Sequence, residues 1–420
     1  MRRLAVAEYQ RVAFPALPAA AARALHATGA VRVSNTPSGA RTILHARSTV
    51  GAVRVGTGDE SVELHVRPKV GVSRLLWLLG HARDQSGWRD DDAQVSQEVG
   101  LVTAMAVMFV ARSRRALATG VLHDYQQQEE TLPGLRGRLR EADQMRARPG
   151  IPLPLEMRYD DYTVDIPENR LLRSAATRLL VLTGVPSRVR MGLIRLDRDL
   201  ADAALLTPGS KPPQIALTRL NRRYAPALHL ARLILQSTSI EHGHGATNAN
   251  GFLFDMNHVY EDWLTQALTA TLETHGGQVR RQQPLALDDN RRVIMHTDIT
   301  WWSGSHCLAV IDAKYKRLLP AGPRPEDLYQ ILAYCTALGL RSGHLVYAAG
   351  TPSPVIIVRN AGVRIHTYVV PLAERPEHIL HAVARVAAQI TQGSSSSSGT
   401  VALSVGKIEA DLSSEAIDPT

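Results

Sequence analysis

The chain has 420 residues, 45% of them hydrophobic, which predicts a globular protein of two or three domains with substantial cores. Lys and Arg total 48 against 39 Asp and Glu, so the formal net charge is +9 and the isoelectric point is near 9.8. This balance favours a polyanionic partner, with nucleic acid as the leading candidate.

Cysteine content and hydropathy exclude several classes of protein. The two cysteines, Cys307 and Cys335, are too few for a disulfide framework or a structural zinc site, and they fit a reducing cytoplasm. The longest uncharged apolar run, residues 100–111, is shorter than the roughly 20 residues of a membrane helix. Glu8 and Arg11 interrupt any hydrophobic leader, so we expect no signal peptide. A soluble, cytoplasmic protein without membrane contact is predicted.

Residues 1–95 alternate short strand-like segments with Gly, Ser and Asn turns. Period-2 or β-branched patterns occur at residues 31–33, 42–44, 51–55 and 62–66. These patterns predict a small β-rich domain. Because none of its residues has catalytic spacing, we expect it to bind or dock.

Residues 96–236 change to a helical pattern. An apolar helix is predicted over residues 99–118, and Pro167 opens an amphipathic one. The acidic segment at residues 160–165 is bounded by proline, and we interpret it as a solvent-facing loop rather than a catalytic site.

Two arginine clusters lie in this helical region. Arg136 and Arg138 belong to the sequence P-G-L-R-G-R-L-R at residues 133–140, and Arg222 and Arg223 form the second cluster. Either cluster can contact DNA phosphates or form ordinary solvated surface. The sequence leaves both interpretations open.

A third domain is predicted over residues 237–390. His242 and His244 in its first loop lack the helical spacing or cysteine support of a zinc site, so we expect no zinc there. An amphipathic helix follows, and Gly276 ends it. Glu261 lies at the edge of its apolar stripe, where a surface glutamate is one interpretation and a group directed at a metal is the other.

Residues 297–316 predict a β-hairpin, because two apolar runs flank the turn at 303–305. Asp312 and Lys314 are two residues apart on the second strand and so share a face. The turn brings Asp298 opposite, or nearly opposite, Asp312. Two carboxylates this close are costly without a cation, and Mg²⁺ is the natural occupant. The alternative is a solvated, charge-paired strand end.

The segment after the hairpin has helical spacing. Asp327, Gln330 and Tyr334 stack along one side at i, i+3 and i+7. A polar stripe on a buried helix needs partners, although ordinary packing at a domain boundary is the alternative for Gln330 and Tyr334.

These motifs resemble those of a known nuclease superfamily. The pattern D-x(13)-D-x-K resembles the PD-(D/E)xK core, with Thr297 in the place of its proline, and Gln330-x-x-x-Tyr334 resembles the Q-x-x-x-Y element of the RecB-like branch. The wider order resembles the McrC family over most of residues 1–390. The segments are P-G-L-R-G-R-L, P-E-N-R-L-L, F-L-F-D-M-N-x-V-Y-E-D-W, T-D-I, D-A-K-Y-K and D-L-Y-Q-I-L-A-Y.

The resemblance implies a multidomain fold of the α+β or α/β class. A β-rich partner-docking domain would occupy residues 1–95, and a helical connecting region 96–236. A PD-(D/E)xK endonuclease domain, with a mixed sheet flanked by helices, would occupy 237–390. Residues 391–420 lack any apolar period, and their serine run predicts a disordered tail.

The same resemblance implies a function. McrC proteins are the nuclease subunits of McrBC-type restriction systems that depend on 5-methylcytosine, and their partner McrB is a hexameric AAA+ GTPase that translocates DNA. The N-terminal domain would dock on that hexamer and stimulate GTP hydrolysis, while the partner recognises the modified base in double-stranded DNA. No G-x-x-x-x-G-K-[ST] motif occurs in the chain, so we expect it to bind no nucleotide itself.

Each matching residue receives an expected role. The carboxylates and the backbone carbonyl of Ala313 would hold Mg²⁺, or Mn²⁺, against a phosphate oxygen, and Lys314 would orient or help deprotonate the attacking water. The residues assigned to catalysis are Asp298, Asp312, Lys314, Glu261, Gln330 and Tyr334. Two other functions stay open: a stand-alone RecB-like nuclease, and a scaffold that activates the GTPase with an idle nuclease site.

Overall fold

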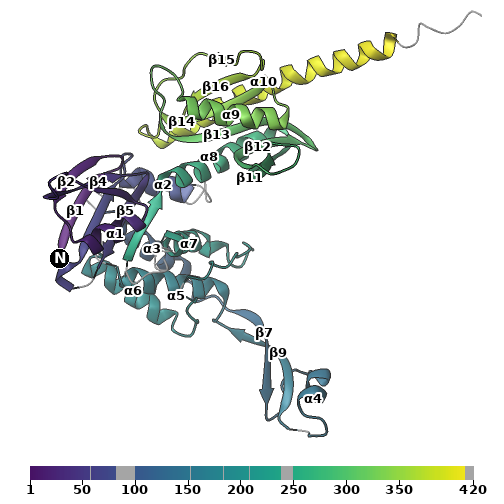
Figure 1. The fold of residues 1–420 in the computed structure, drawn as a ribbon. Helices are drawn as coiled ribbons and strands as arrows, with labels where there is room; N and C mark the ends of the chain where they lie inside the picture. The colour runs from purple at the N-terminus through teal and green to yellow at the C-terminus, as the bar shows by residue number, and fades with distance from the viewer. Residues whose placement is uncertain are drawn as a thin grey trace, which may run out of the picture. The chain divides into compact units, whose positions relative to one another are not determined.

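The computed structural model has a mixed α+β fold with several sheets (Figure 1). The chain divides into two compact units: residues 1–76 with 86–254, and residues 77–85 with 255–420. Within the described ranges, no helix combines the length and apolarity needed to cross a membrane. The described residues are 1–56, 58–81, 100–151, 153–182, 184–207, 209–237 and 249–411.

Two sheets build the N-terminal part of the first unit, which fits the predicted β-rich region. Gly51 has a φ of +129°, and a Cβ at this position would lie 1.9 Å from the carbonyl oxygen of Phe252, so glycine lets two strands meet here. The four-stranded sheet has the order β1 (Arg2–Ala7), β6 (Val62–Arg67), β5 (Thr49–Val55), β10 (Ala249–Asp255). The three-stranded sheet has the order β2 (Arg11–Pro15), β4 (Arg41–Ala46), β3 (Val31–Asn35), and α1 (Ala19–Ala27) contacts β3.

Helices form the rest of the unit's core. Phe109, Leu172 and Leu179 are fully buried among them. Gly192 allows α6 to approach α3 closely, because a Cβ there would lie 2.7 Å from a methyl group of Val110. The helices are α3 (Leu101–Leu117), α5 (Pro167–Leu180), α6 (Ser187–Asp199) and α7 (Ala225–Ser237).

A separate three-stranded sheet interrupts the region that the sequence predicts to be helical. Its order is β7 (Asp124–Leu132), β9 (Leu155–Thr163), β8 (Arg138–Leu139), with α4 (Glu141–Ala147) beside β9. The acidic segment predicted as a loop therefore lies mostly in β9, paired with β7. Most side chains of β7 are exposed, so its sequence lacks the alternation of apolar and polar residues that would predict a strand.

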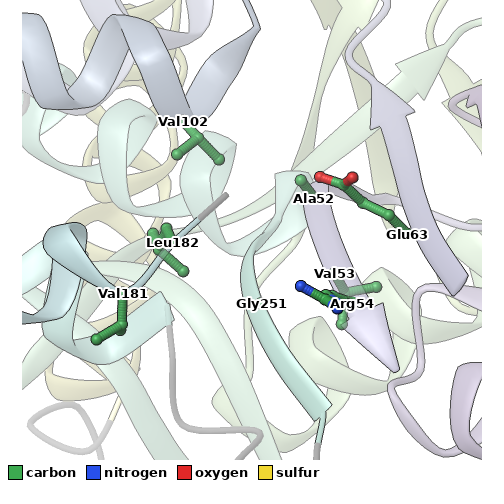
Figure 2. Close-up of a pocket in the computed structure, with 8 residues that line it drawn as sticks. All are labelled: Ala52, Val53, Arg54, Glu63, Val102, Val181, Leu182 and Gly251. Atoms are coloured by element: carbon green, nitrogen blue, oxygen red, sulfur yellow. The ribbon is translucent and has the colours of Figure 1, made fainter. Parts of the chain in front are cut away.

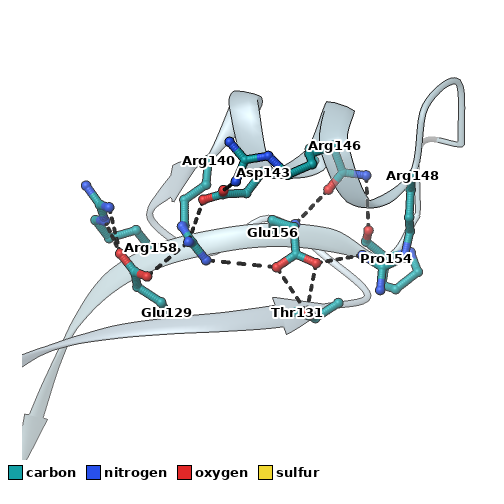
Figure 3. Close-up of polar contacts among 10 residues, drawn as sticks. Glu129, Thr131, Arg140, Asp143, Arg146, Arg148, Pro154, Glu156 and Arg158 are labelled. Atoms are coloured by element: carbon teal, nitrogen blue, oxygen red, sulfur yellow. Dashed lines mark hydrogen bonds and ion pairs between the residues drawn. The ribbon is translucent and has the colours of Figure 1, made fainter.

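Polar contacts hold this sheet, which we call the arm (Figure 3). Glu156 accepts hydrogen bonds from Arg148 at 2.7 Å and from the hydroxyl of Thr131 at 3.0 Å. Glu129 pairs with Arg158 at 2.6 Å and with Arg140 at 3.1 Å. The pKa of Glu156 is lowered, mainly by the hydrogen bond from Arg148. Exposed pairs of this kind contribute little individually, so the arm depends on their network.

The second unit contains a six-stranded mixed sheet. β11, β12 and β13 are antiparallel, whereas β13, β14 and β16 run parallel. The strand order is β11 (Gln278–Ala286), β12 (Ile294–Ser303), β13 (His306–Arg317), β14 (Ser342–Ala349), β16 (Arg364–Val369), β15 (Ile356–Ile357). α9 (Pro325–Leu338) covers one face through Ile331 and Cys335, which pack on Val310 and Leu345.

The opposite face is covered by α8 (Met256–Leu272), whose Tyr260 contacts Tyr315 of β13. Trp263 of α8 packs on Trp77 of α2 (Val72–His81), with ring centroids 5.6 Å apart. A segment that the sequence assigns to the N-terminal domain thus contributes to the second unit's core. Its apolar helical pattern identifies the helix but does not identify the surface on which it packs.

A long C-terminal helix includes part of the segment that the sequence predicts to be a disordered tail. α10 (Pro376–Asp411) continues through the serine run, although a disordered tail is predicted from residue 391. Ile379 and Ile390 are fully buried, and no proline follows Pro376 before Asp411, so a helix anchored by packing can propagate. Residues 412–420 lie outside the described residues, as do His242 and His244.

Candidate active site

A β-bulge sets the register of the hairpin. Ser303 pairs with His306 across the two-residue turn, and without a shift Asp298 would meet Ile311. The register shifts between Trp301 and Trp302, so that Ile299 pairs with Ile311 and Asp298 lies at the level of Asp312. Because a one-residue slip turns a side chain to the other face, the bulge places both acids together.

Asp298 and Asp312 are linked through the backbone as well. The amide of Ala313 donates a hydrogen bond of 2.8 Å to Oδ2 of Asp298. Burial raises the pKa of Asp298 to about 7, and the charges of Asp312 and Glu261 add to the rise. Three carboxylates therefore act on one another electrostatically, which disfavours their joint ionisation without a cation.

Asp312 is completely buried, and its carboxylate oxygens accept no hydrogen bond of normal geometry from the described residues. Lys314 Nζ lies 2.5 Å from Oδ2 as an ion pair. Burial raises the pKa of Asp312, whereas Lys314 lowers it, and the net direction is upward. A buried carboxylate with unsatisfied oxygens is costly unless a cation or a proton compensates it.

The polar stripe of α9 fixes Lys314. Its Nζ donates to Oε1 of Gln330 at 2.7 Å, and Nε2 of Gln330 lies 2.8 Å from the hydroxyl of Tyr334. That hydroxyl donates to the backbone carbonyl of His296 on β12 at 2.6 Å. The chain of hydrogen bonds therefore connects β13, α9 and β12 around the ammonium. Gln330 and Tyr334 are four residues apart, so both side chains lie on the same face of α9.

Glu261 is half-buried on α8. The helix begins at Asp255, whose side chain accepts a hydrogen bond from the amide of Asn257 at 2.9 Å. Tyr260 and Trp263 are fully buried and anchor the helix, so Glu261 stands at the edge of the apolar stripe. Its Oε1 accepts a hydrogen bond from Nε2 of Gln282 at 3.1 Å.

Three residues that are not among the predicted site residues, Asp327, Lys316 and Tyr347, complete the polar network. Asp327 is buried, and its Oδ1 lies 2.7 Å from Nζ of Lys316 and 4.0 Å from Nζ of Lys314. The hydroxyl of Tyr347 donates to Oδ2 of Asp327 at 2.8 Å. Burial raises the pKa of Tyr347, so its hydroxyl remains a donor. Lys316 follows Lys314 by two residues, so both lie on the same face of the strand. This spacing is the sequence signal that could have placed Lys316 at the site.

The donor set suits a hard divalent cation. Carboxylate and carbonyl oxygens are the ligands that Mg²⁺ prefers, and one or two carboxylates with water suffice. Among the described residues, no three acidic, His or Cys side chains are grouped closely enough to hold a metal ion by themselves. Lys314 instead compensates the charge of Asp312. The buried Oδ1 of Asp312, which has no hydrogen-bond partner among the described residues, is the feature that fits a cation best.

The four arginines predicted to contact phosphate differ in their environment. Arg136 pairs with Asp161 at 2.7 Å and stacks on Tyr159. Arg223 donates to the carbonyl of Gly120 at 2.9 Å. The guanidinium groups of Arg136 and Arg223 thus make contacts within the protein. The side chains of Arg138 and Arg222 are exposed.

A small cavity in the first unit is an alternative site (Figure 2). Its volume is about 50 Å³, and apolar side chains form most of its wall. Glu63 is buried beside it and pairs with Arg3 at 3.2 Å and with His65 at 3.1 Å. This volume suits one or two water molecules rather than a substrate. The lining residues are Ala52, Val53, Arg54, Glu63, Val102, Val181, Leu182 and Gly251.

The chain is similar to known restriction-system proteins over most of its length. A family model described as "McrBC 5-methylcytosine restriction system component" matches residues 44–348. No curated protein matches the chain. A chain of the "Refined half-complex from tetradecameric assembly of Thermococcus gammatolerans McrB AAA+ hexamers with bound McrC" is 17% identical, with a TM-score of 0.59 over 92% of this chain and 100% of that chain. A chain of the cryo-EM structure of the Thermococcus gammatolerans McrBC complex is 18% identical, with a TM-score of 0.42 over 64% of this chain and 88% of that chain.

Proposed function

Because the chain belongs to the family of McrBC 5-methylcytosine restriction system components, we propose that it is the Mg²⁺-dependent endonuclease subunit of such a system. The observation that carries the proposal is the placement of Asp298, Asp312 and Lys314 at one position of the hairpin, with Asp312 buried, its Oδ2 ion-paired with Lys314 and its Oδ1 without a hydrogen-bond partner among the described residues. The reaction would be hydrolysis of a DNA phosphodiester.

The surrounding elements support a PD-(D/E)xK core. A helix that carries Glu261 precedes the hairpin, the hairpin carries the acidic pair, and α9 follows with Gln330 and Tyr334. This order matches the pattern that the sequence resembles. The parallel strands β14 and β16 extend the sheet beside β13 and bury the strand that carries Asp312.

Asp298, Asp312, Glu261 and the carbonyl of Ala313 would hold Mg²⁺ or Mn²⁺. When bound, the metal would act as a Lewis acid on a phosphate oxygen and as a template for the scissile group. The protein's own task is to keep the carboxylates together against their repulsion, which the bulge in β12–β13 and the amide of Ala313 accomplish.

Lys314 would orient the attacking water and offset charge that develops on the phosphate. Gln330 holds the ammonium at 2.7 Å, and Tyr334 holds Gln330 in turn, so the amine is directed before substrate binds. Lys316 forms an ion pair with Asp327 at 2.7 Å. Asp327 is thus a second carboxylate beside Lys314, with its Oδ1 4.0 Å from the Nζ of that lysine.

We propose a McrB-like AAA+ GTPase hexamer as the partner and methylated double-stranded DNA as the substrate. The Thermococcus gammatolerans assembly is described as McrB AAA+ hexamers with bound McrC, and this chain covers the full length of its matching chain. Residues 1–95 remain our proposed docking region. The lack of a P-loop motif assigns nucleotide hydrolysis to the partner.

A reconstituted cutting assay tests this function. The chain is combined with a McrB-like AAA+ GTPase, and cleavage of methylated and unmethylated DNA is measured with and without GTP. We expect cutting only with methylated DNA, partner, GTP and Mg²⁺, and none with Asp312→Asn. Cutting by the chain alone would favour a stand-alone nuclease. GTPase stimulation without any cutting would favour a non-catalytic scaffold.

A further inference from the structure

Gln282 has an unusual backbone for a residue inside a strand. Its φ is +42°, within β11 (Gln278–Ala286). The other non-glycine residues with positive φ in the described chain, Tyr9, Arg291 and Asn360, lie in turns or bends. This conformation is costly for a residue with a Cβ, and such residues concentrate at functional sites.

The distortion occurs at the level of an acidic residue of the site. Arg281 pairs with Ile299 and Gln283 pairs with Thr297, but the intervening pair, Gln282 with Asp298, is not formed. The ladder resumes in the same register on both sides. The strand is therefore bent at one residue rather than shifted.

The neighbours of Gln282 hold the strand in place. The hydroxyl of Thr300 donates to Oε1 of Gln283 at 3.2 Å, and that of Thr297 donates to the carbonyl of Gln283 at 3.4 Å. These contacts and the strand pairing on both sides fix the backbone around Gln282. Such a surrounding is what allows a strained conformation to persist.

The left-handed backbone accompanies a contact with α8. Nε2 of Gln282 donates to Oε1 of Glu261 at 3.1 Å, while Arg281 bonds Oδ1 of Asp262 at 3.3 Å. Two successive residues of β11 thus engage two successive residues of α8. The guanidinium of Arg281 pairs with Asp262, which is exposed. The neutral amide of Gln282 contacts Glu261, whose charge raises the pKa of both Asp298 and Asp312.

This division of donors has a chemical reason. An arginine beside Glu261 would neutralise the carboxylate and compete with a metal, whereas an amide fixes its orientation and leaves its charge available. One oxygen of Glu261 is held by Gln282, so the other can face the aspartates. Hydrogen bonds of this kind orient the ligands of metal sites.

We propose that Gln282 is a positioning residue, whose amide aims Glu261 at the metal site and whose left-handed backbone makes that contact possible. The inference rests on the proposed function, because it concerns the same site. It assigns to Gln282 an effect on metal affinity that passes through Glu261.

Gln282→Gly tests the proposal, because glycine accepts a φ of +42° without strain but lacks the amide. We expect the full chain to melt at the same or a higher temperature and to bind Mn²⁺ about 10-fold more weakly by calorimetric titration. Arg281→Gln is the matched control, since it removes the neighbouring contact to Asp262, and its Mn²⁺ affinity should stay within about twofold of the parent's.

A double-mutant cycle shows whether the effect passes through Glu261. In a Glu261→Ala background, Gln282→Gly should produce no further loss of Mn²⁺ affinity. Parental affinity in the single variant, equal additional loss in the double variant, or unfolding of Gln282→Gly would each overturn the proposal. If the parent chain binds no Mn²⁺ and Asp312→Asn changes nothing, the proposed function itself fails.

Discussion

Lys314 Nζ lies 2.5 Å from Oδ2 of Asp312, two residues earlier on the same strand, and this ion pair occupies a nearly solvent-free position. The charges of Asp327 and Glu261 raise the pKa of Asp312, and Asp327 also lies 4.0 Å from Lys314. The charges of Asp312 and Glu261 in turn raise the pKa of Asp298. Lys314 and Lys316 are the ammonium groups that contact these acids. The site is therefore acidic overall, and a cation would lower its free energy.

Asp312→Asn should abolish DNA cutting and leave the protein folded. Asparagine keeps the shape of the side chain but removes the charge that would bind a metal. Because burial raises the pKa of Asp312, the substitution should also raise the melting temperature in metal-free buffer at pH 8. Circular dichroism melts and a cutting assay measure both effects. Full activity in the variant would remove Asp312 from the site.

The stability of the metal-free protein should depend on Asp298. Its pKa is about 7 in the folded chain against an ordinary value of 3.8, so the folded state binds the proton more tightly. The resulting stabilisation is complete below about pH 4 and is lost as the pH rises through 7. We expect the melting temperature to fall between pH 6.5 and 8. Asp298→Asn should flatten that slope, and Mg²⁺ should oppose the fall.

The lower limit of this pH window is set by His344. Burial lowers its pKa to about 3, and His366 adds to the effect, so the folded state binds fewer protons than the unfolded state below about pH 6.5. Stability from this group is lost as the pH falls. An unchanged pH slope in Asp298→Asn between 6.5 and 8 would show that Asp298 is not the titrating group.

Local patterns in the sequence predict much of the second unit and less of the first. The hairpin and α9 follow from alternation and helical spacing, which are short-range signals. The bulge between Trp301 and Trp302 does not, because it depends on how the strands fit the whole sheet. Contacts such as Lys316 with Asp327 join β13 and α9, and residue spacing along one element cannot identify them.

The sequence predicts neither the arm nor the packing of α2 on α8, for different reasons. β7 exposes most of its side chains and carries a polar sequence, so neither period 2 nor hydrophobicity marks it. Trp77 is typical of an apolar helix, yet its partner is Trp263, far along the chain. The change from a strand-like to a helical pattern suggested a boundary near residue 95, whereas Trp77 of α2 belongs to the second unit.

The four arginines should fall into two classes by their effect on DNA binding. Arg138→Ala and Arg222→Ala should each flatten the log–log salt dependence of DNA affinity by about 0.9 in the assembled complex, because each removes one phosphate contact. Arg136→Ala should mainly destabilise the arm, since it breaks the pair with Asp161. If the Arg138→Ala, Arg222→Ala double variant kept the parent's slope, these arginines would be ordinary surface.

Cutting and GTPase stimulation should be separable by a point substitution rather than by deletion. Removing residues 1–95 would take Trp77 from the face of Trp263 and the β5 partner from β10, so such a fragment would be damaged. Deletion of residues 1–95 therefore cannot separate the two activities cleanly. A substitution at the site avoids the problem.

Lys314→Ala should bind the partner and stimulate GTP hydrolysis as the parent does, but cut DNA at least about 100-fold more slowly, because its ammonium would act only on the phosphodiester and its water. Lys211→Ala, which removes an exposed lysine of the first unit, is the matched control and should retain both activities. GTP turnover, partner binding and cutting are measured on the same preparations. Loss of GTPase stimulation in Lys314→Ala, with the protein folded and bound, would show that the two activities are coupled through the active site.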